Sequence, residues 1–253
     1  MRRMQVYDTH CHLGLDGKAV PADEHMRARA AQVTDMLVVG IDAATSRTAR
    51  DLAAQLPGVH WSAGLHPNDS SRFDAEWSAL TALAETPGCT AIGETGLDNF
   101  RDRTPAPQQE RALRAHLALA RRVDLPVIFH CRDAFAPLFA VLRSEQQVRG
   151  VMHCFSGGVE QAREALDLGL YLSFAGPLTY PKNQALRDAA AFAPADRIVV
   201  ETDAPFLPPQ RRRGQRNEPA FVVETLDALA QARGITLADA AALTFSNATA
   251  LFG

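Results

Sequence analysis

The sequence predicts a (β/α)8 TIM barrel, and three observations support that prediction. Short apolar, β-branched runs alternate with helical patterns about eight times, as repeated strand-helix units do. The chain has 253 residues, a length that suits such a barrel as one unit. No Gly- or Ser-rich linker and no change of composition divides it. We therefore expect a single domain over residues 1–253, with any functional site at the C-terminal mouth of the strands.

The expected strands are short, and several are apolar almost throughout, which is typical of parallel strands covered on both faces. They span residues 4–8, 36–41, 59–65, 90–93, 126–129, 150–153, 171–175 and 197–201. Apolar residues at helical spacing predict helices over 75–85 and 108–122, and further helices are expected after Asp133, Val159, Asn183 and Pro219. His116 is expected to pack within its helix or to cap it, and His25 and His60 to have structural roles.

An open, doubly wound sheet is the alternative arrangement for this alternation. It would need a nucleotide-binding glycine motif, and neither G-x-G-x-x-G nor G-x-x-x-x-G-K-[ST] occurs in the sequence. The closed barrel is therefore the preferred fold.

Composition and charge exclude several classes of protein. Hydrophobic residues make up 47% of the chain, enough for a large core. A net charge of −3 argues against a protein that coats nucleic acid through a basic surface, although a local basic groove is still allowed. The start of the chain lacks the apolar core of a signal peptide, and no run approaches the length of a membrane span. We expect a cytoplasmic protein with no membrane partner, and a monomer because no exposed heptad pattern is present.

The four cysteines do not have the spacing of zinc fingers or C-x-x-C motifs. Three of them directly follow a histidine, so strand alternation should turn their thiols away from those imidazoles. We expect all four to be small buried residues: Cys11, Cys89, Cys131 and Cys154.

Ionisable residues mark the ends of five expected strands. His10 and His12 are two positions apart behind the first strand, so they should share one face. Alone, such a pair is also compatible with solvated surface histidines. The full set, however, should converge at the mouth of the barrel: His10, His12, Glu94, His130, His153 and Asp203.

Burying such a cluster is costly unless its members are solvated, hydrogen-bonded together or bound to cations. Imidazole and carboxylate ligands suit Zn or Mn, whereas Mg usually prefers oxygen; the metal's identity among Mg, Mn and Zn stays open. Six ligands exceed the needs of one tetrahedral ion, so we expect two divalent ions with a carboxylate such as Glu94 between them.

The chain resembles the TatD-type metal-dependent deoxyribonucleases of the amidohydrolase superfamily over nearly its whole length. The matching segments are DTHCH (8–12), GLHP (64–67), GETGLD (93–98), HCRDA (130–134), HCFSGG (153–158), SFAGP (173–177), ETDAPFL (201–207) and RNEP (216–219). The resemblance implies a 3′–5′ exonuclease acting on DNA, sometimes on RNA or abasic sites. Other members of the broader group deacylate mischarged tRNA.

The resemblance also implies a role for each residue of the cluster. His10, His12 and Asp203 would hold one ion, His130 and His153 the other. Glu94 would bridge them, at a position where many superfamily members have a modified lysine. As a hypothesis, the reaction is in-line hydrolysis of a phosphodiester, with Asp203 taking the proton of the attacking water.

Several residues around the cluster have two open interpretations. His66 either donates to a substrate phosphate or orders its loop, and Arg132 either binds phosphate or forms a salt bridge. Glu201 is expected to hold the second ring nitrogen of a ligand histidine, and Asp98 to act in the same way. Phe100 and Tyr180 either stack on a base or close their loops. The run 211–213, three arginines, is either a solvated loop or an attractor for a polyanion.

Two other functions use the same residues. An ester or amide hydrolase, such as an aminoacyl-tRNA deacylase, would need the same activated water. A scaffold that merely carries metal is the third alternative, but it gives no reason for a carboxylate such as Asp203 beside a solvent-open metal pair.

Overall fold

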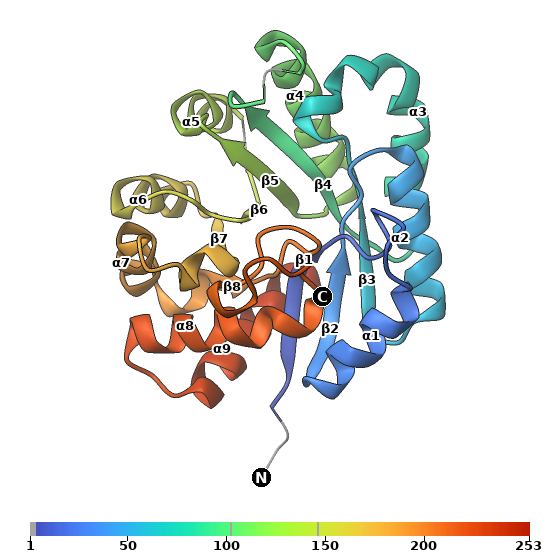
Figure 1. Ribbon diagram of the computed structural model, residues 1–253. Helices are drawn as coiled ribbons and strands as arrows, with labels where there is room; N and C mark the ends of the chain where they lie inside the picture. Colours follow the sequence, from blue (N-terminus) through green and yellow to red (C-terminus); the bar gives the residue numbers. More distant parts are fainter. Residues whose placement is uncertain (1–3, 102, 146) are drawn as a thin grey trace.

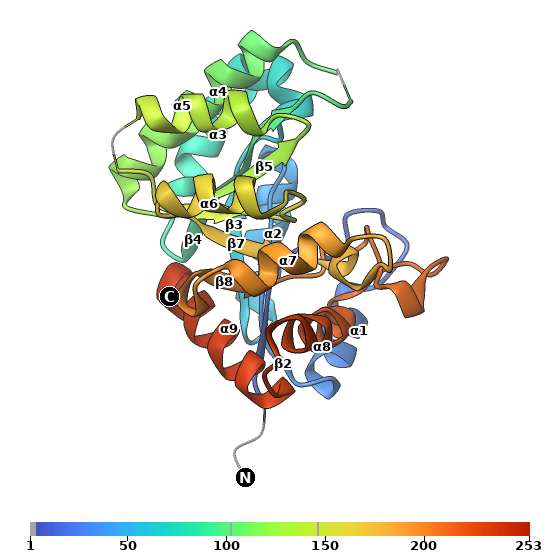
Figure 2. The same ribbon diagram turned by 90° about the vertical axis from the view of Figure 1, so that its left-hand side faces the viewer.

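Eight parallel strands, paired in the order β1 to β8, form a barrel surrounded by helices in the computed structural model (Figures 1 and 2). The structure describes residues 4–101, 103–145 and 147–253. Residues 1–3 lie outside this part. They begin the segment in which the sequence analysis expects no signal peptide. The expected (β/α)8 barrel in a single domain is confirmed.

The strands and helices alternate along the chain as the sequence pattern predicts. The strands are β1 (Val6–Cys11), β2 (Val33–Val38), β3 (Val59–Ala63), β4 (Cys89–Asp98), β5 (Val127–Arg132), β6 (Gly150–Met152), β7 (Tyr171–Phe174) and β8 (Ile198–Val200). The α-helices are α1 (Pro21–Ala30), α2 (Ala43–Gln55), α3 (Phe73–Ala84), α4 (Ala106–Val123), α5 (Phe135–Ser144), α6 (Val159–Asp167), α7 (Gln184–Phe192), α8 (Val222–Arg233) and α9 (Leu237–Phe252). Short 3-10 helices are η1 (Pro67–Arg72), η2 (Gly176–Thr179), η3 (Ala195–Arg197), η4 (Gln210–Arg212) and η5 (Pro219–Phe221).

The ring of strands closes between β8 and β1 just beyond the end of β8. The backbone N–H of Asp203 donates to His10 O at 2.9 Å, and that of His12 donates to Ala204 O at 2.7 Å. The closing hydrogen bonds therefore involve three of the predicted site residues, so the barrel's own backbone fixes where these residues lie.

Three strands run further toward the mouth than the sequence predicts. β1 continues to Cys11, β4 to Asp98 and β5 to Arg132, whereas the predictions stopped at 8, 93 and 129. Pairing of β4 with β5 persists through Gly96 opposite His130. A Cβ at Gly96, which has φ +149°, would lie 2.0 Å from His130 O. The β4–β5 pair extends because glycine permits this close approach.

The interior of the barrel is closed at the end opposite the mouth by α9, which the sequence analysis did not predict. Inward-facing side chains from six strands form one cluster with the end of α9: Tyr7, Leu37, Val39, Ala91, Ile128, Val151, Val199, Ala248, Leu251 and Phe252. A larger apolar layer packs between the strands and the surrounding helices. His116 lies in that layer as expected, with Nδ1–H donating to Ala112 O and Nε2 accepting from Leu65 N.

Within the described residues, no single helix is both long and apolar enough to cross a membrane; only the bent pair Pro219–Arg233 and Leu237–Phe252 has that composition.

Candidate metal centre

A cavity of about 710 Å³ opens at the C-terminal ends of the strands, and the predicted cluster lies in its floor. His10 and His12 come from the end of β1, on one face as alternation requires. Their Nε2 atoms are 3.2 Å apart, and both side chains are buried. Two ring nitrogens this close suit a shared cation.

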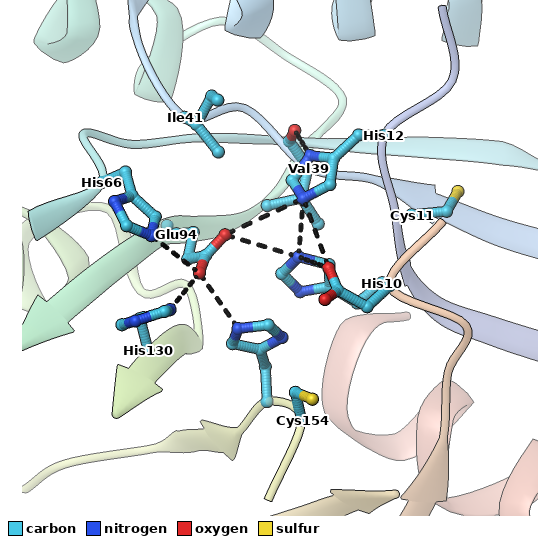
Figure 3. A network of polar contacts seen from close by, with 12 residues as sticks. His10, Cys11, His12, Val39, Ile41, His66, Glu94, His130 and Cys154 are labelled. Atoms are coloured by element: carbon cyan, nitrogen blue, oxygen red, sulfur yellow. Dashed lines mark hydrogen bonds and ion pairs between the residues drawn. The ribbon is translucent and has the colours of Figure 1, made fainter. Parts of the chain in front are cut away.

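Glu94 on β4 lies at the centre of the cluster, as Figure 3 shows. Its Oε2 lies 3.5 Å from His10 Nε2 and 3.9 Å from His12 Nε2. Its Oε1 faces the other side, 2.6 Å from His130 Nδ1 and 3.0 Å from His153 Nε2. Burial alone would raise the pKa of Glu94, but His153 and the other imidazoles hold it well below its usual range. The carboxylate is thus ionised and shared by two histidine pairs.

His12 and His153 are held in the tautomer that metal binding requires. His12 Nδ1 lies 2.9 Å from the Val39 carbonyl, which can only accept, so Nδ1 carries the proton. His153 Nδ1 lies 3.1 Å from Glu201 Oε1 and is protonated for the same reason. In both rings Nε2 is therefore the nitrogen that faces the site and that a cation would bind. Glu201 has the position that the sequence analysis assigned to it.

His130 contacts a carboxylate through each ring nitrogen. Nε2 is 3.2 Å from Asp98 Oδ2, and Nδ1 faces Glu94. Burial would lower the pKa of His130, but these two carboxylates raise it. With Nε2–H bound to Asp98, the nitrogen that remains for a cation is Nδ1, so Asp98 orients this ring as expected.

His66 also reaches Glu94, with 3.6 Å between its Nε2 and Oε1, but its tautomer differs. Its Nδ1 accepts the backbone N–H of Asn68 at 3.1 Å, at the start of η1. A neutral ring that accepts at Nδ1 carries its proton at Nε2. Burial lowers the pKa of His66 to about 4, so the ring is neutral. His66 is therefore a hydrogen-bond donor in the site rather than a metal ligand, and it orders its loop as well.

Asp203 completes the cluster from the loop that follows β8. Its Oδ1 lies 3.8 Å from His10 Nε2 and 3.7 Å from His12 Nε2. Burial raises its pKa, but the hydrogen bond with His12 and the charge of His153 bring it below the usual value. The residue adopts a left-handed backbone, with φ 57°.

The expected positions of the basic and aromatic residues are right in part. Arg132 lines the cavity, with its guanidinium 3.8 Å from the centre of the exposed Phe100 ring. For the run 211–213 and Tyr180, the positions favour the structural alternative that the sequence analysis left open. Neither the run 211–213 nor Tyr180 lines the cavity: Arg212 pairs with Glu224 at 2.7 Å, and Arg213 lies over the Tyr180 ring. The sequence analysis missed Arg101 and Arg103, which do line it.

One cysteine departs from the expectation. Cys11, Cys89 and Cys131 are buried in the apolar layer, and all four cysteines are free. Cys154 is partly exposed and lines the cavity. It follows the end of β6 with a left-handed backbone (φ 42°), so strand alternation does not govern where its side chain lies.

The donor atoms fit divalent cations. Three groups have their potential ligand atoms within 4.8 Å of one another: His10, His153 and Asp203; His10, His12 and Glu94; His66, Glu94 and His130. Nε2 of His12 and of His153 faces inward, and the carboxylates of Glu94 and Asp203 are ionised. Apart from His66, these groups consist of the six residues that the sequence analysis expects as ligands.

A barrel with such a cluster at the C-terminal ends of its strands defines a metal-dependent hydrolase. Comparison with known proteins identifies the family. The model for "TatD related DNase" matches residues 7–253. The chain belongs to the TatD family.

Relatives with and without an assigned activity are about equally similar to this chain. YabD of Bacillus subtilis, called an uncharacterized metal-dependent hydrolase, is 36% identical and covers 98% of each chain. The 3′-5′ ssDNA/RNA exonuclease TatD of Citrobacter koseri is 38% identical and covers 90% of each. The crystal structure of YJJV, a TatD homolog from Escherichia coli, superposes with a TM-score of 0.92 at 30% identity, covering 98% of this chain and 97% of that one.

Proposed function

We propose that this metal-dependent hydrolase is a 3′–5′ exodeoxyribonuclease that uses two divalent ions, with RNA as a second substrate. The observation that supports it best is the division of the Glu94 carboxylate between two ligand pairs, because a bridged ion pair suits the in-line displacement of a phosphodiester. The TatD relatives named as exonucleases support the choice of substrate.

In this proposal each ion has its own set of ligands. His10, His12 and Asp203 would hold one, through the Nε2 atoms and a carboxylate oxygen that lie within 3.8 Å of one another. His130 and His153 would hold the second, and Glu94 would be shared between them. The mixture of imidazole and carboxylate favours Zn or Mn over Mg.

When bound, the two cations would lower the pKa of a water molecule and neutralise charge that develops on the phosphate. Asp203, ionised in the folded protein, orients the water and accepts its proton. The Nε2–H of His66 donates to a non-bridging phosphate oxygen, in keeping with its tautomer. Arg132, at the wall of the cavity, binds phosphate oxygens through its guanidinium.

A substrate panel tests the proposal. The purified chain is incubated with a single-stranded DNA bearing a 3′-hydroxyl, the same strand blocked at its 3′ end, an RNA of the same sequence and an aminoacyl-tRNA, each with Mg, Mn or Zn. We expect stepwise loss of 3′ nucleotides from the unblocked DNA, more slowly from the RNA, and none after chelation.

The competing ester hydrolase gives the opposite pattern. Deacylation of the aminoacyl-tRNA with both DNA strands left intact would replace the nuclease assignment, while the same cations and ligands would still be needed. Equal cleavage of blocked and unblocked DNA would contradict the exonuclease polarity alone. The expected cytoplasmic location and monomeric state remain predictions.

A further inference from the structure

The two sides of the cavity mouth differ in chemistry. Strand order places β4 and β5 across the barrel from β8 and β1. The β4–β5 side carries three guanidiniums that line the cavity and, beside Arg132 but outside the lining, the exposed Phe100 ring. We call these residues the cationic rim: Phe100, Arg101, Arg103 and Arg132. The β8–β1 side carries apolar side chains, which we call the apolar rim: Leu15, Phe206 and Leu207. The metal cluster lies between the two rims.

The cationic rim presents an exposed aromatic ring on a hydrogen-bonded loop. Phe100 is 60% exposed, and the Arg132 guanidinium is 3.8 Å from its ring centre. Asp98 holds the loop by accepting the backbone N–H groups of Phe100 and Arg101, both at 2.9 Å. The same carboxylate contacts His130, so the position of the loop is tied to the metal cluster. A fixed ring beside a guanidinium suits one nucleobase and its phosphate.

Acidic groups on this side do not cancel its charge. Asp98 is committed to His130, to Asn68 Nδ2 and to the two backbone N–H groups. Asp69 also lines the cavity, but its Oδ1 lies 3.8 Å from Arg72 Nη1, and the charges of Arg72 and then Arg103 act on it. Among the described residues, the three guanidiniums thus face carboxylates that already have partners.

The apolar rim is equally well fixed. Phe206 is 49% exposed and Leu207 40% exposed, although both line the cavity. The Phe206 ring meets His12 edge-on with 6.2 Å between the ring centres. Its backbone N–H donates to Asp203 O at 2.8 Å, and its carbonyl accepts from Asn217 Nδ2 at 2.6 Å. An apolar face this close to a metal ligand suits the base of a terminal nucleotide, which has no phosphate on its 3′ side.

We propose that the two rims fix the direction of the strand in the cleft: the 3′-terminal base packs on Phe206 and Leu207, and the penultimate base stacks on Phe100. This rests on the proposed exonuclease function. In a strand shortened from its 3′ end, every phosphate beyond the scissile one lies on the 5′ side. The polyanionic part of the substrate therefore belongs on the cationic rim, and the base of the departing 3′ nucleotide on the apolar one.

Abasic substitutions in the substrate test the assignment base by base. Three DNA trinucleotides are compared: one intact, one with a tetrahydrofuran residue at the terminal position and one with it at the penultimate position. Removing a stacked base should raise KM about tenfold in the wild-type protein. Phe100→Ala should reduce the penalty at the penultimate position to less than about twofold and leave the terminal penalty in place. Phe206→Ala should do the reverse.

A matched control is available in α7. Phe192 is 40% exposed and has Arg163 over its ring at 4.8 Å, but Arg163 does not line the cavity, whereas Arg132 beside Phe100 does. Phe192→Ala should keep both penalties at their wild-type size. Since Phe100 and Phe206 are exposed, both variants should keep the wild-type thermal midpoint, which is measured alongside.

Two results would overturn the proposal. An exchanged pattern, with Phe100→Ala removing the terminal penalty, would mean that the strand runs in the opposite direction. Penalties that persist in both variants would mean that neither rim stacks on a base. Either result leaves the exonuclease function standing, whereas no cleavage of the intact trinucleotide by the wild-type protein would refute that function and the assignment with it.

Discussion

Replacing Glu201 by Gln tests how the fold prepares His153 for a cation. Glu201 is fully buried, and its Oε1 accepts from His153 Nδ1 at 3.1 Å and from Cys154 N at 2.8 Å. Its Oε2 has no partner among the described residues. Glutamine keeps an acceptor for the two N–H groups but removes the negative charge behind the ring, and its NH2 group would have no acceptor.

The size of the effect follows from these contacts. Loss of the partner behind a metal-ligating histidine typically costs 10- to 100-fold in metal affinity, which is about 1.4 to 2.8 kcal/mol. Because Glu201 contacts His153 and not His12, we expect the weakening at the ion held by His130 and His153, with much less change at the other. Activity at low metal concentration should fall in proportion and recover when the metal is in excess.

Titration of the metal-free protein with Mn or Zn against a competing chelator measures both affinities. Glu224→Gln serves as the matched control, because Glu224 is a partly buried carboxylate paired with Arg212 and remote from the cavity. Unchanged affinity in the Glu201→Gln protein would refute the reasoning. So would a loss of activity that excess metal does not restore.

Three further predictions concern catalysis, charge and pH. Asp203→Asn should lower kcat by about 10²- to 10⁴-fold while the circular dichroism spectrum stays that of the wild type, since Asn tolerates the left-handed backbone; a folded, fully active variant would exclude the role of this carboxylate. Neutralising Arg132 with Gln should reduce the salt dependence of single-stranded DNA binding by about 0.7 in the log–log slope, whereas neutralising 211–213 should change it less; equal effects would contradict the observed lining of the cavity. Burial lowers the pKa of His116 from 6.5 to about 4. Below pH 6.5 the unfolded chain therefore binds the proton more readily than the folded one. The free energy of unfolding should fall by up to about 3 kcal/mol as pH drops from 6.5 to 4. Urea unfolding across that range should show a shallower decline in His116→Gln, and an identical decline would refute the assignment.

The ligand cluster was predictable because barrel topology does most of the positioning. Parallel strands in a closed ring bring their C-terminal ends together, so polar residues after separate runs must converge. His10 and His12 follow from alternation alone. The same topology predicts Glu94 and His153 beside them, without any knowledge of interatomic distances.

Other features depend on contacts that no local pattern reveals. The role of His66 follows from its tautomer, which the Asn68 N–H decides through the geometry of η1. Arg101 and Arg103 belong to an irregular loop whose direction is set by the hydrogen bonds of Asp98. The basic run 211–213 has a stronger sequence signal than these, yet its side chains turn to Glu224 and Tyr180. The helix α9 follows α8, after the eighth strand-helix unit is complete, so strand-helix alternation no longer predicts an element there.

Anomalous diffraction from crystals of this protein soaked in Mn or Zn tests the central claim most directly. We expect two peaks, one on each side of the Glu94 carboxylate: one next to His10, His12 and Asp203, the other next to His130 and His153, with His66 contacting neither. A single peak, or peaks on only one side of Glu94, would contradict the account of a bridged ion pair.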